Sequence, residues 1–244
     1  MKRRVNGTQL LLEKRASEFR QNHGLNDREP IRLKSLLQKL NVQTMFKPLG
    51  DQFCGVAIKS DQNRFMLINS NQSLGRQHFT ICHELYHLFI QDDFSFQVCT
   101  PGQFDAKNPE EYKADWFAAY LLIPRDGVLS QISDWDELDA NQIQLATILH
   151  IEQFFSCSRQ ALLRRLEDVG LIDRGYGESF RQDVKRSATL FGFTTELYEP
   201  GNEGQHIGDY GTKAKRLFDE EKISESHYFS LLKDLGVDVH ALQV

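Results

Sequence analysis

His83, Glu84 and His87 form the motif HExxH, whose residue types and spacing suit metal-dependent hydrolysis. On a helix, residues i and i+4 share one face with Cβ atoms about 5–6 Å apart, so the two histidines can bind one metal ion. Glu84 follows the first histidine directly and would lie beside that metal. Zinc lowers the pKa of a bound water toward about 7, and Glu84 can then take the proton from that water as a general base. The motif predicts a zinc-dependent peptidase.

Two alternatives to this interpretation must be considered. Five-residue motifs also occur by chance on exposed helices that bind no metal. The neighbouring residues oppose that alternative because they are apolar and would bury the helix: Phe79, Ile81, Leu85, Leu88 and Phe89. Two histidines with a carboxylate also describe a non-haem iron site. The glutamate inside the motif favours hydrolysis, and therefore Zn²⁺, over iron chemistry.

A catalytic zinc site needs a third protein ligand and an open position. Glu111 is the best candidate because it begins the next predicted helix with Asp115 at i+4 on the same face. Asp115 could accept a hydrogen bond from the second ring nitrogen of a ligand histidine, which is the usual arrangement around such sites. Glu110 is a rival ligand. As the third residue after Asn108, Glu111 could instead cap its own helix.

Two longer stretches around these residues resemble the ImmA/IrrE metallopeptidases. The first is QHFTICHELYHL at residues 77–88, and the second is ExxADxFAAxLLIP at residues 111–124. The strand end at residues 67–71 is similar too. The likeness covers residues 33–124 well and continues more loosely through residues 161–172. The pair of motifs is specific, whereas either one alone would be weaker.

The resemblance implies that His83, His87 and Glu111 hold the zinc ion. It also implies that Glu84 is the catalytic glutamate. Known members of the family cleave or relieve a helix-turn-helix repressor in mobile-element control or DNA-damage responses. We therefore expect a gluzincin-like metallo-endopeptidase that cleaves a protein substrate, such as a helix-turn-helix transcriptional repressor.

The chain departs from the family pattern at two positions. Tyr86 stands where a small residue is common, and Gln91 stands where a further histidine is frequent. Neither change removes a ligand, but both bear on substrate preference and access to the site. No residue is assigned to stabilise the oxyanion, because His78 precedes His83 by five residues and points to another face of the helix.

The elements that must position these residues follow from hydrophobic periodicity and from helix start and stop signals. The last two predicted strands pair through a turn at residues 60–63, and residues 91–107 form a long loop. Glycines make residues 200–211 a flexible link. Helices are predicted over residues 8–22, 33–40, 73–90 and 109–123, twice between 141 and 170, and over 224–236, and strands over 42–47, 55–59 and 65–69.

This order of elements predicts an α+β fold: a mainly helical zincin-like catalytic domain with a small N-terminal sheet, then an all-helical C-terminal region. We divide the chain into a zinc metallopeptidase domain at residues 1–135, a helix-turn-helix-like hairpin at 136–175 and a helical accessory region at 176–244.

The predicted hairpin could bind DNA through Arg159, Arg164 and Arg165 on its second helix. The alternative is a helical hairpin that covers the catalytic domain or docks a partner. Few arginines and several interspersed acidic residues favour the second interpretation. Direct nucleic-acid binding is thus the less favoured of the two.

Composition restricts the remaining possibilities. The 244 residues carry a formal net charge of −5, so no overall positive field attracts nucleic acid or an anionic membrane. The four cysteines lack the CxxC spacing of a thiolate zinc site and are expected to be free and buried. With no signal-peptide pattern and no apolar run long enough to span a bilayer, a cytoplasmic location is expected.

A second function is also compatible with these observations. The chain could be a regulatory module that binds a repressor or DNA, with little or no catalysis and a metal ion that is only structural. Metal analysis combined with a cleavage assay would separate this module from the peptidase.

Overall fold

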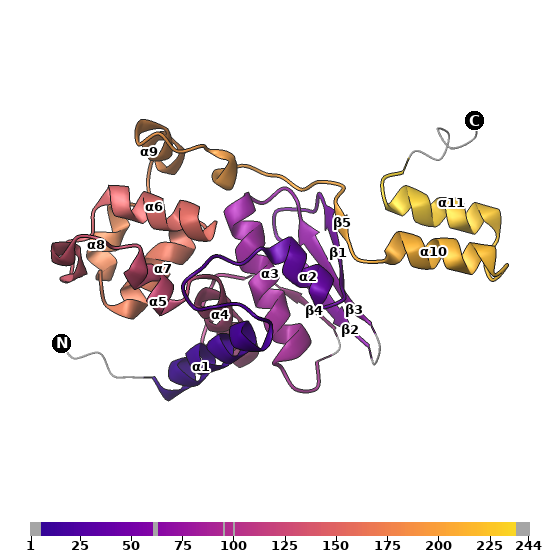
Figure 1. Ribbon diagram of the computed structural model, residues 1–244, viewed down its shortest axis with the longest axis horizontal. Coiled ribbons are helices and arrows are strands. Elements are labelled where there is room, and N and C mark those ends of the chain that lie inside the picture. The colour runs from indigo at the N-terminus through magenta and orange to yellow at the C-terminus, as the bar shows by residue number, and fades with distance from the viewer. Residues whose placement is uncertain (1–5, 61–62, 95, 100, 238–244) are drawn as a thin grey trace.

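The structure, a computed structural model, describes residues 6–60, 63–94, 96–99 and 101–237 (Figure 1). Its first half contains α1 (Gly7–Asn22), α2 (Leu33–Lys39), β1 (Val42–Lys47), β2 (Gly55–Lys59), β3 (Arg64–Asn69), α3 (Leu74–Phe89), β4 (Phe96–Cys99) and α4 (Pro109–Leu122). The second half contains α5 (Arg125–Ser130), η1 (Trp135–Leu138), α6 (Leu145–Phe155), α7 (Arg159–Val169), α8 (Arg174–Glu178), α9 (Val184–Leu190), η2 (Glu196–Tyr198), β5 (His206–Ile207), α10 (Tyr210–Asp219) and α11 (Glu225–Asp234). Helices surround one small sheet, and the predicted α+β class is confirmed.

The sheet has the strand order β4-β2-β3-β1-β5. β1 and β3 are parallel, and the other neighbouring strands are antiparallel. The predicted pairing of β2 with β3 is present, and the amide of Ser60 donates to the Asn63 carbonyl at 2.9 Å across their turn. The central strands β2 and β3 lie against α3, so the sheet supports the helix that carries the HExxH motif.

Two expectations about the sheet are wrong. The predicted loop at residues 91–107 contains β4, which pairs with β2 at one edge of the sheet. The C-terminal region is not all-helical, because β5 pairs with β1 at the other edge. Gly204 and Gln205 exchange further backbone hydrogen bonds with Phe46, so this part of the predicted flexible link is docked. Backbone groups at an open sheet edge recruit such segments whatever their side-chain pattern.

Helices α3 and α4 pack on each other in the centre of the molecule, and α1 covers α4. Gly75 in α3 permits the close approach of the α6–α7 connection, since a Cβ atom there would lie 2.8 Å from the amide nitrogen of Ser158. One apolar core extends from Leu12 to Ile172 and includes residues on both sides of position 135. The proposed domain boundaries at 135 and 175 stay predictions.

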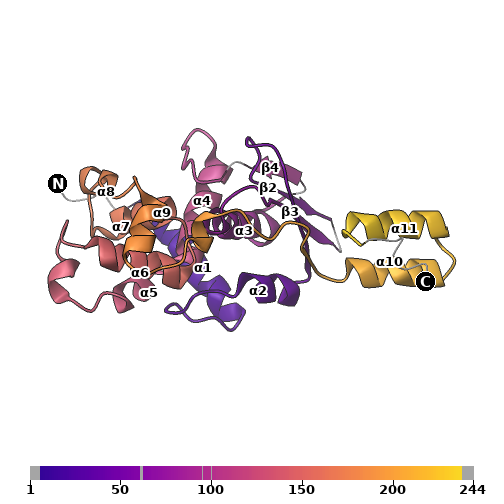
Figure 2. The same cartoon turned by 90° about the horizontal axis from the view of Figure 1, so that it is seen from above.

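The C-terminal helices α10 and α11 pack on each other and project away from the sheet (Figure 2). The short helices α8 and α9 were not predicted, because stretches of five and seven residues carry little periodic signal. Among the described residues, no helix has both the length and the apolar character required to cross a membrane.

Candidate metal centre

Helix α3 holds the HExxH motif in the interior of the protein. Its contacts with β2 and β3 on one side and with α4 on the other leave His83, Glu84 and His87 fully buried. Ser73 precedes the helix as predicted, although its side chain makes no capping hydrogen bond. Burying two imidazoles and a carboxylate is costly unless they are paired or bind a metal. The buried imidazoles and carboxylate of the motif therefore require hydrogen-bond partners or a metal ion.

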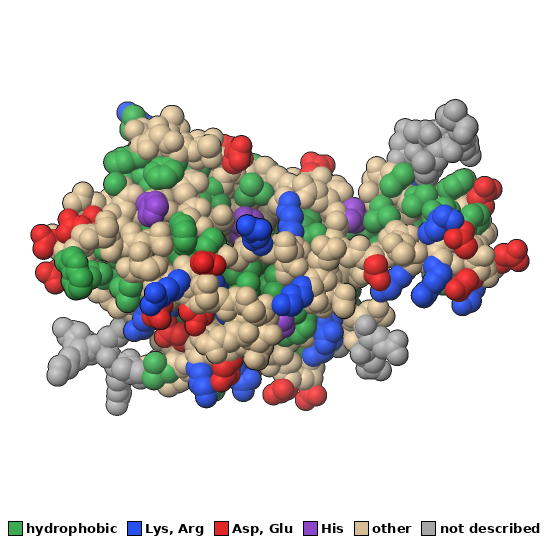
Figure 3. Space-filling view, viewed as in Figure 1, with side chains coloured by type: hydrophobic (Ala, Val, Ile, Leu, Met, Phe, Trp, Pro, Cys, Tyr) green, Lys and Arg blue, Asp and Glu red, His purple; other side chains and the backbone are tan. Residues whose placement is uncertain are grey.

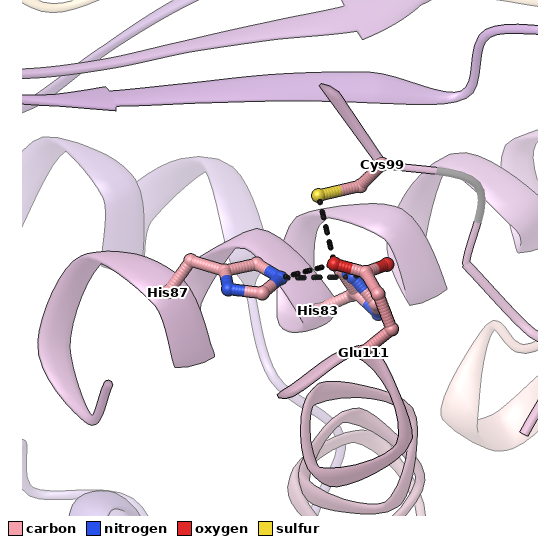
Figure 4. A group of neighbouring side chains, drawn as sticks. All are labelled: His83, His87, Cys99 and Glu111. Atoms are coloured by element: carbon pink, nitrogen blue, oxygen red, sulfur yellow. Dashed lines mark hydrogen bonds and ion pairs between the residues drawn. The ribbon is translucent and has the colours of Figure 1, made fainter. Parts of the chain in front are cut away.

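The second helix supplies one such partner (Figure 4). The two carboxylate oxygens of Glu111 lie 3.2 Å from Nε2 of His83 and 3.3 Å from Nε2 of His87. The two Nε2 atoms are 3.1 Å apart. Donor atoms from α3 and α4 thus converge on one point, and the structure brings together the three predicted ligands.

These separations can be compared with the edges of a zinc coordination tetrahedron. Two nitrogen or oxygen ligands at about 2.0–2.1 Å from the metal lie about 3.3–3.4 Å from each other in a tetrahedral site. The two imidazole nitrogens are 3.1 Å apart, close to that length, and each has a different oxygen of Glu111 at a similar distance, 3.2 or 3.3 Å. The residues present therefore fit a zinc ion, and the cluster could hold a metal.

The alternatives for the third ligand are not adopted. Asn108 caps α4 by accepting from the amide of Glu111, while the Glu111 side chain turns toward the histidines. Hydrogen bonds from His83 and His87 outweigh the effect of burial and hold the pKa of Glu111 well below its usual range. Glu110 points elsewhere: it accepts from the hydroxyl of Tyr86 at 2.9 Å and from Lys113.

Asp115 lies at 2.9 Å from the second ring nitrogen, Nδ1, of His83. Its two oxygens also accept from the backbone amides of Gly102 and Phe104, each at 2.7 Å. Despite the opposing effect of burial, hydrogen bonds with Asp115 and Glu111 raise the pKa of His83 to about 10. Asp115 thus orients a histidine and anchors the chain that follows β4. Its predicted role beside the metal has the geometry that this role requires.

Gln91, noted in the sequence as a departure from the family pattern, makes a contact in the site that the sequence analysis did not identify. Its side-chain oxygen lies 2.5 Å from Nδ1 of His87, so His87 has a partner equivalent to Asp115. The signal was its i+4 spacing from His87, just beyond the end of α3. Where relatives frequently have a histidine, this chain has an amide that can fix the orientation of the ring.

Glu84 is buried with very few partners. Neither of its oxygens accepts a hydrogen bond that meets ordinary geometry from a described residue, although the Cys99 thiol and the charges of His83, His87 and Glu111 act on it. Burial raises the pKa of Glu84 to about 7, although the two histidines oppose this effect. A carboxyl group with this pKa is suited to accept and return a proton near neutral pH.

Gly55 makes room for Glu84. A Cβ atom at position 55 would lie 2.9 Å from Oε1 of Glu84 and 2.7 Å from Cγ2 of Thr80. The sequence offered only a glycine at a strand start, and its contact with α3 depends on how the sheet packs. The absence of a side chain at this position is a structural requirement of the site.

Cys99, at the end of β4, is another site residue that the sequence missed. Its sulfur lies 3.6 Å from Oε1 of Glu111, and it belongs with His83, His87 and Glu111 to a group whose donor atoms all lie within 4.8 Å of one another (Figure 4). All four cysteines are buried thiols as expected, but this one faces the cluster.

Other residues considered from the sequence lie outside this cluster. His78 is hydrogen-bonded through Nδ1 to the Ser156 carbonyl at 2.7 Å, so it faces the α6–α7 connection. Arg159 and Arg165, which the less favoured DNA-binding alternative would use, are buried and paired with Glu152 and Asp168 respectively. On the face shown in Figure 3, Lys and Arg side chains are interspersed with Asp and Glu. These features provide little surface for phosphate contacts.

Comparison with known proteins adds a family match. The model of the IrrE N-terminal-like domain, a peptidase family, matches residues 37–167, more than half of the chain. Among solved structures, a Mycobacterium tuberculosis transcriptional regulator is similar over 64% of this chain, with 16% sequence identity and a TM-score of 0.43. The similarity covers 46% of the regulator's own chain. No curated protein matches the sequence.

Proposed function

The chain belongs to the ImmA/IrrE family of metallopeptidases, and from this premise we propose that it is a zinc-dependent endopeptidase acting on a protein substrate. The observation that carries the proposal is the convergence of His83, His87 and Glu111 beside the buried carboxylate of Glu84. A cluster that can hold a metal, with an adjacent carboxyl group of pKa about 7, is suited to metal-assisted peptide hydrolysis.

In this proposal His83, His87 and Glu111 hold the zinc ion. When bound, zinc would polarise water and the scissile carbonyl. Glu84 takes a proton from the attacking water as the new C–O bond forms. It then passes that proton to the amine nitrogen as the C–N bond breaks. Asp115 and Gln91 keep the two imidazoles in position through their Nδ1 atoms.

The proposed substrate is a helix-turn-helix transcriptional repressor. This choice rests on the family resemblance, whose known members cleave or relieve such repressors in mobile-element or stress regulation. A cytoplasmic location belongs to the same proposal, because a DNA-binding repressor acts there. A small helix-turn-helix protein encoded beside this chain would be the first substrate to assay.

Replacing the proposed base tests the mechanism. We expect Glu84→Gln to keep bound zinc and to lose cleavage by about 10²–10⁴-fold, since a positioned acid–base group contributes on that order. Gln keeps the size of the side chain and removes its proton affinity. The measurements are zinc content and mass-spectrometric detection of repressor fragments. Glu110→Gln is the matched control, because the carboxylate of Glu110 accepts hydrogen bonds from Tyr86 and Lys113 rather than from the cluster residues. Unchanged cleavage by Glu84→Gln would contradict the proposed mechanism.

A second candidate function is favoured by one observation. Structural zinc sites are closed by four protein ligands and commonly include cysteine, and Cys99 lies within the cluster. On this interpretation the chain is a regulator that binds a repressor and holds a structural metal. A zinc-loaded protein that binds the repressor but never releases fragments, even with Cys99 replaced by alanine, would establish the second function.

A further inference from the structure

The sulfur of Cys99 lies beside the donor atoms of His83, His87 and Glu111. We propose that the Cys99 thiolate is a metal ligand and that it closes the site at rest. This inference rests on the proposed function and concerns the regulation of the same site. A catalytic zinc keeps one position open, so hydrolysis would require the thiolate to leave.

The first support is the position of the sulfur. In a tetrahedral site with a sulfur at about 2.3 Å and an oxygen at about 2.0 Å from zinc, the two ligand atoms lie about 3.5 Å apart. The sulfur of Cys99 lies 3.6 Å from Oε1 of Glu111. This distance suits two ligands of one zinc ion, and the donor atoms of the four residues all lie within 4.8 Å of one another.

The second support is the way the fold directs Cys99 toward the helix. In the β2–β4 ladder Cys99 is paired with Gly55. Cross-strand partners project to the same face of a sheet, and a side chain at Gly55 would point at Thr80 and Glu84 of α3. Because Gly55 has none, the thiol can reach the space beside Glu84. Cys99 therefore faces the cluster because of its strand register.

The third support is that the segment beyond Cys99 is tied to the same site. Asp115 accepts from the amides of Gly102 and Phe104 while its Oδ1 also contacts His83. One carboxylate thus links the orientation of a ligand histidine to the placement of the chain that carries Cys99.

Glu84 indicates why this closure is temporary. No described residue gives its buried carboxylate a hydrogen bond of ordinary geometry, which a structural group of this kind would require. In a permanently closed site the Glu84 carboxylate would have no water to deprotonate. Exchange of the thiolate for water would supply that proton donor. In the exchange the sulfur–metal bond breaks, and the thiolate takes up a proton from solvent. β4 lies at the sheet edge and pairs with β2 alone, so its displacement disrupts a single ladder.

X-ray absorption at the zinc edge of the full-length protein tests the inference directly. We expect a sulfur scatterer at about 2.3 Å in the unaltered protein and only nitrogen and oxygen scatterers at about 2.0–2.1 Å in Cys99→Ala. Cys157→Ala is the matched control, because Cys157 is equally buried but lies outside the cluster. It should keep the sulfur signal.

Cobalt substitution supplies a second readout that does not depend on cleavage. The unaltered protein should show a sulfur-to-cobalt charge-transfer band in the near ultraviolet, and Cys99→Ala should lack it. Added azide should change the visible bands of Cys99→Ala and leave those of the unaltered protein unchanged, because only the variant offers an open position. The dissociation constant for zinc should rise at least about tenfold in Cys99→Ala, since even indirect partners contribute that much.

The outcomes separate this inference from the proposed function. Nitrogen and oxygen scatterers alone in the unaltered protein would overturn the ligand and leave the peptidase proposal intact. A sulfur signal that persists in Cys99→Ala would also overturn it. A sulfur scatterer in a protein that cleaves no repressor, even as Cys99→Ala, would support the ligand and refute the peptidase.

Discussion

Substituting Gly55 by alanine tests whether the space beside Glu84 matters for catalysis. The new Cβ atom would lie 2.9 Å from Oε1 of Glu84 and 2.7 Å from Cγ2 of Thr80. Ordinary contacts begin at about 3.4 Å, so the shortfall is about 0.5–0.7 Å. Either the carboxylate or the helix must move by that amount. Gly55 has no positive φ, so the backbone itself tolerates alanine.

The expected effect on rate follows from that displacement. A misplacement of about 1 Å can cost about 10²-fold in rate, and a shift of half that or more should cost about 10- to 100-fold in kcat/KM. This equals about 1.4–2.7 kcal/mol of lost transition-state stabilisation. His83, His87 and Glu111 should still hold zinc, because the added Cβ atom would lie closest to Glu84 and Thr80 rather than to those three residues.

The assay is single-turnover cleavage of the repressor with zinc content and thermal unfolding measured in parallel. Gly50→Ala is the matched control, because a Cβ atom there meets nothing nearer than 4.0 Å. Combining Gly55→Ala with Thr80→Ser removes the shorter contact and keeps the one with Glu84. If Gly55→Ala folds, binds zinc and cleaves at the unaltered rate, the argument that Gly55 positions the base is refuted.

Three further predictions concern zinc binding, stability and pH. Asp115→Asn should weaken zinc binding by about 10–100-fold, measured by chelator competition, because it loses the charged acceptor for His83; unchanged affinity would contradict its proposed role. Arg165→Ala should lower the free energy of unfolding by about 3–5 kcal/mol in urea titrations, because it leaves buried partners uncompensated. Arg164→Ala, which removes a partly exposed stacking contact, should cost about 1 kcal/mol or less. Burial lowers the pKa of His78 below its ordinary value of 6.5, so the unfolded chain binds this proton more readily. The stability contributed by His78 is therefore present above pH 6.5 and is lost as the pH falls toward the pKa of His78 in the folded protein. The measurement is the free energy of unfolding as a function of pH. The same pH dependence in the unaltered protein and in His78→Asn would contradict this prediction.

The helical half of the site could be predicted from the sequence because its geometry is local. The i, i+4 spacing of His83 and His87 fixes their relation once the helix forms. The same spacing relates Glu111 to Asp115 on α4. The meeting of these two helices could not be derived from spacing, but the resemblance to a peptidase family implied it. In the structure Glu111 contacts both histidines, and Asp115 contacts His83.

The sheet half of the site could not be predicted, because strand register is a long-range property. Gly55 and Cys99 lie far apart in the chain, and nothing in either segment states that they pair. A shift of the register by one residue would turn the Cys99 side chain to the opposite face of the sheet. β4 itself, four residues within a long irregular stretch, carries too short a pattern to be distinguished from a loop. Helix periodicity therefore determines the relative positions of Glu84 and the two histidines. Strand pairing determines the position of the Cys99 thiol and the space that Gly55 leaves beside Glu84. Mutations that shift β4 should consequently alter metal coordination without touching any residue of the HExxH motif.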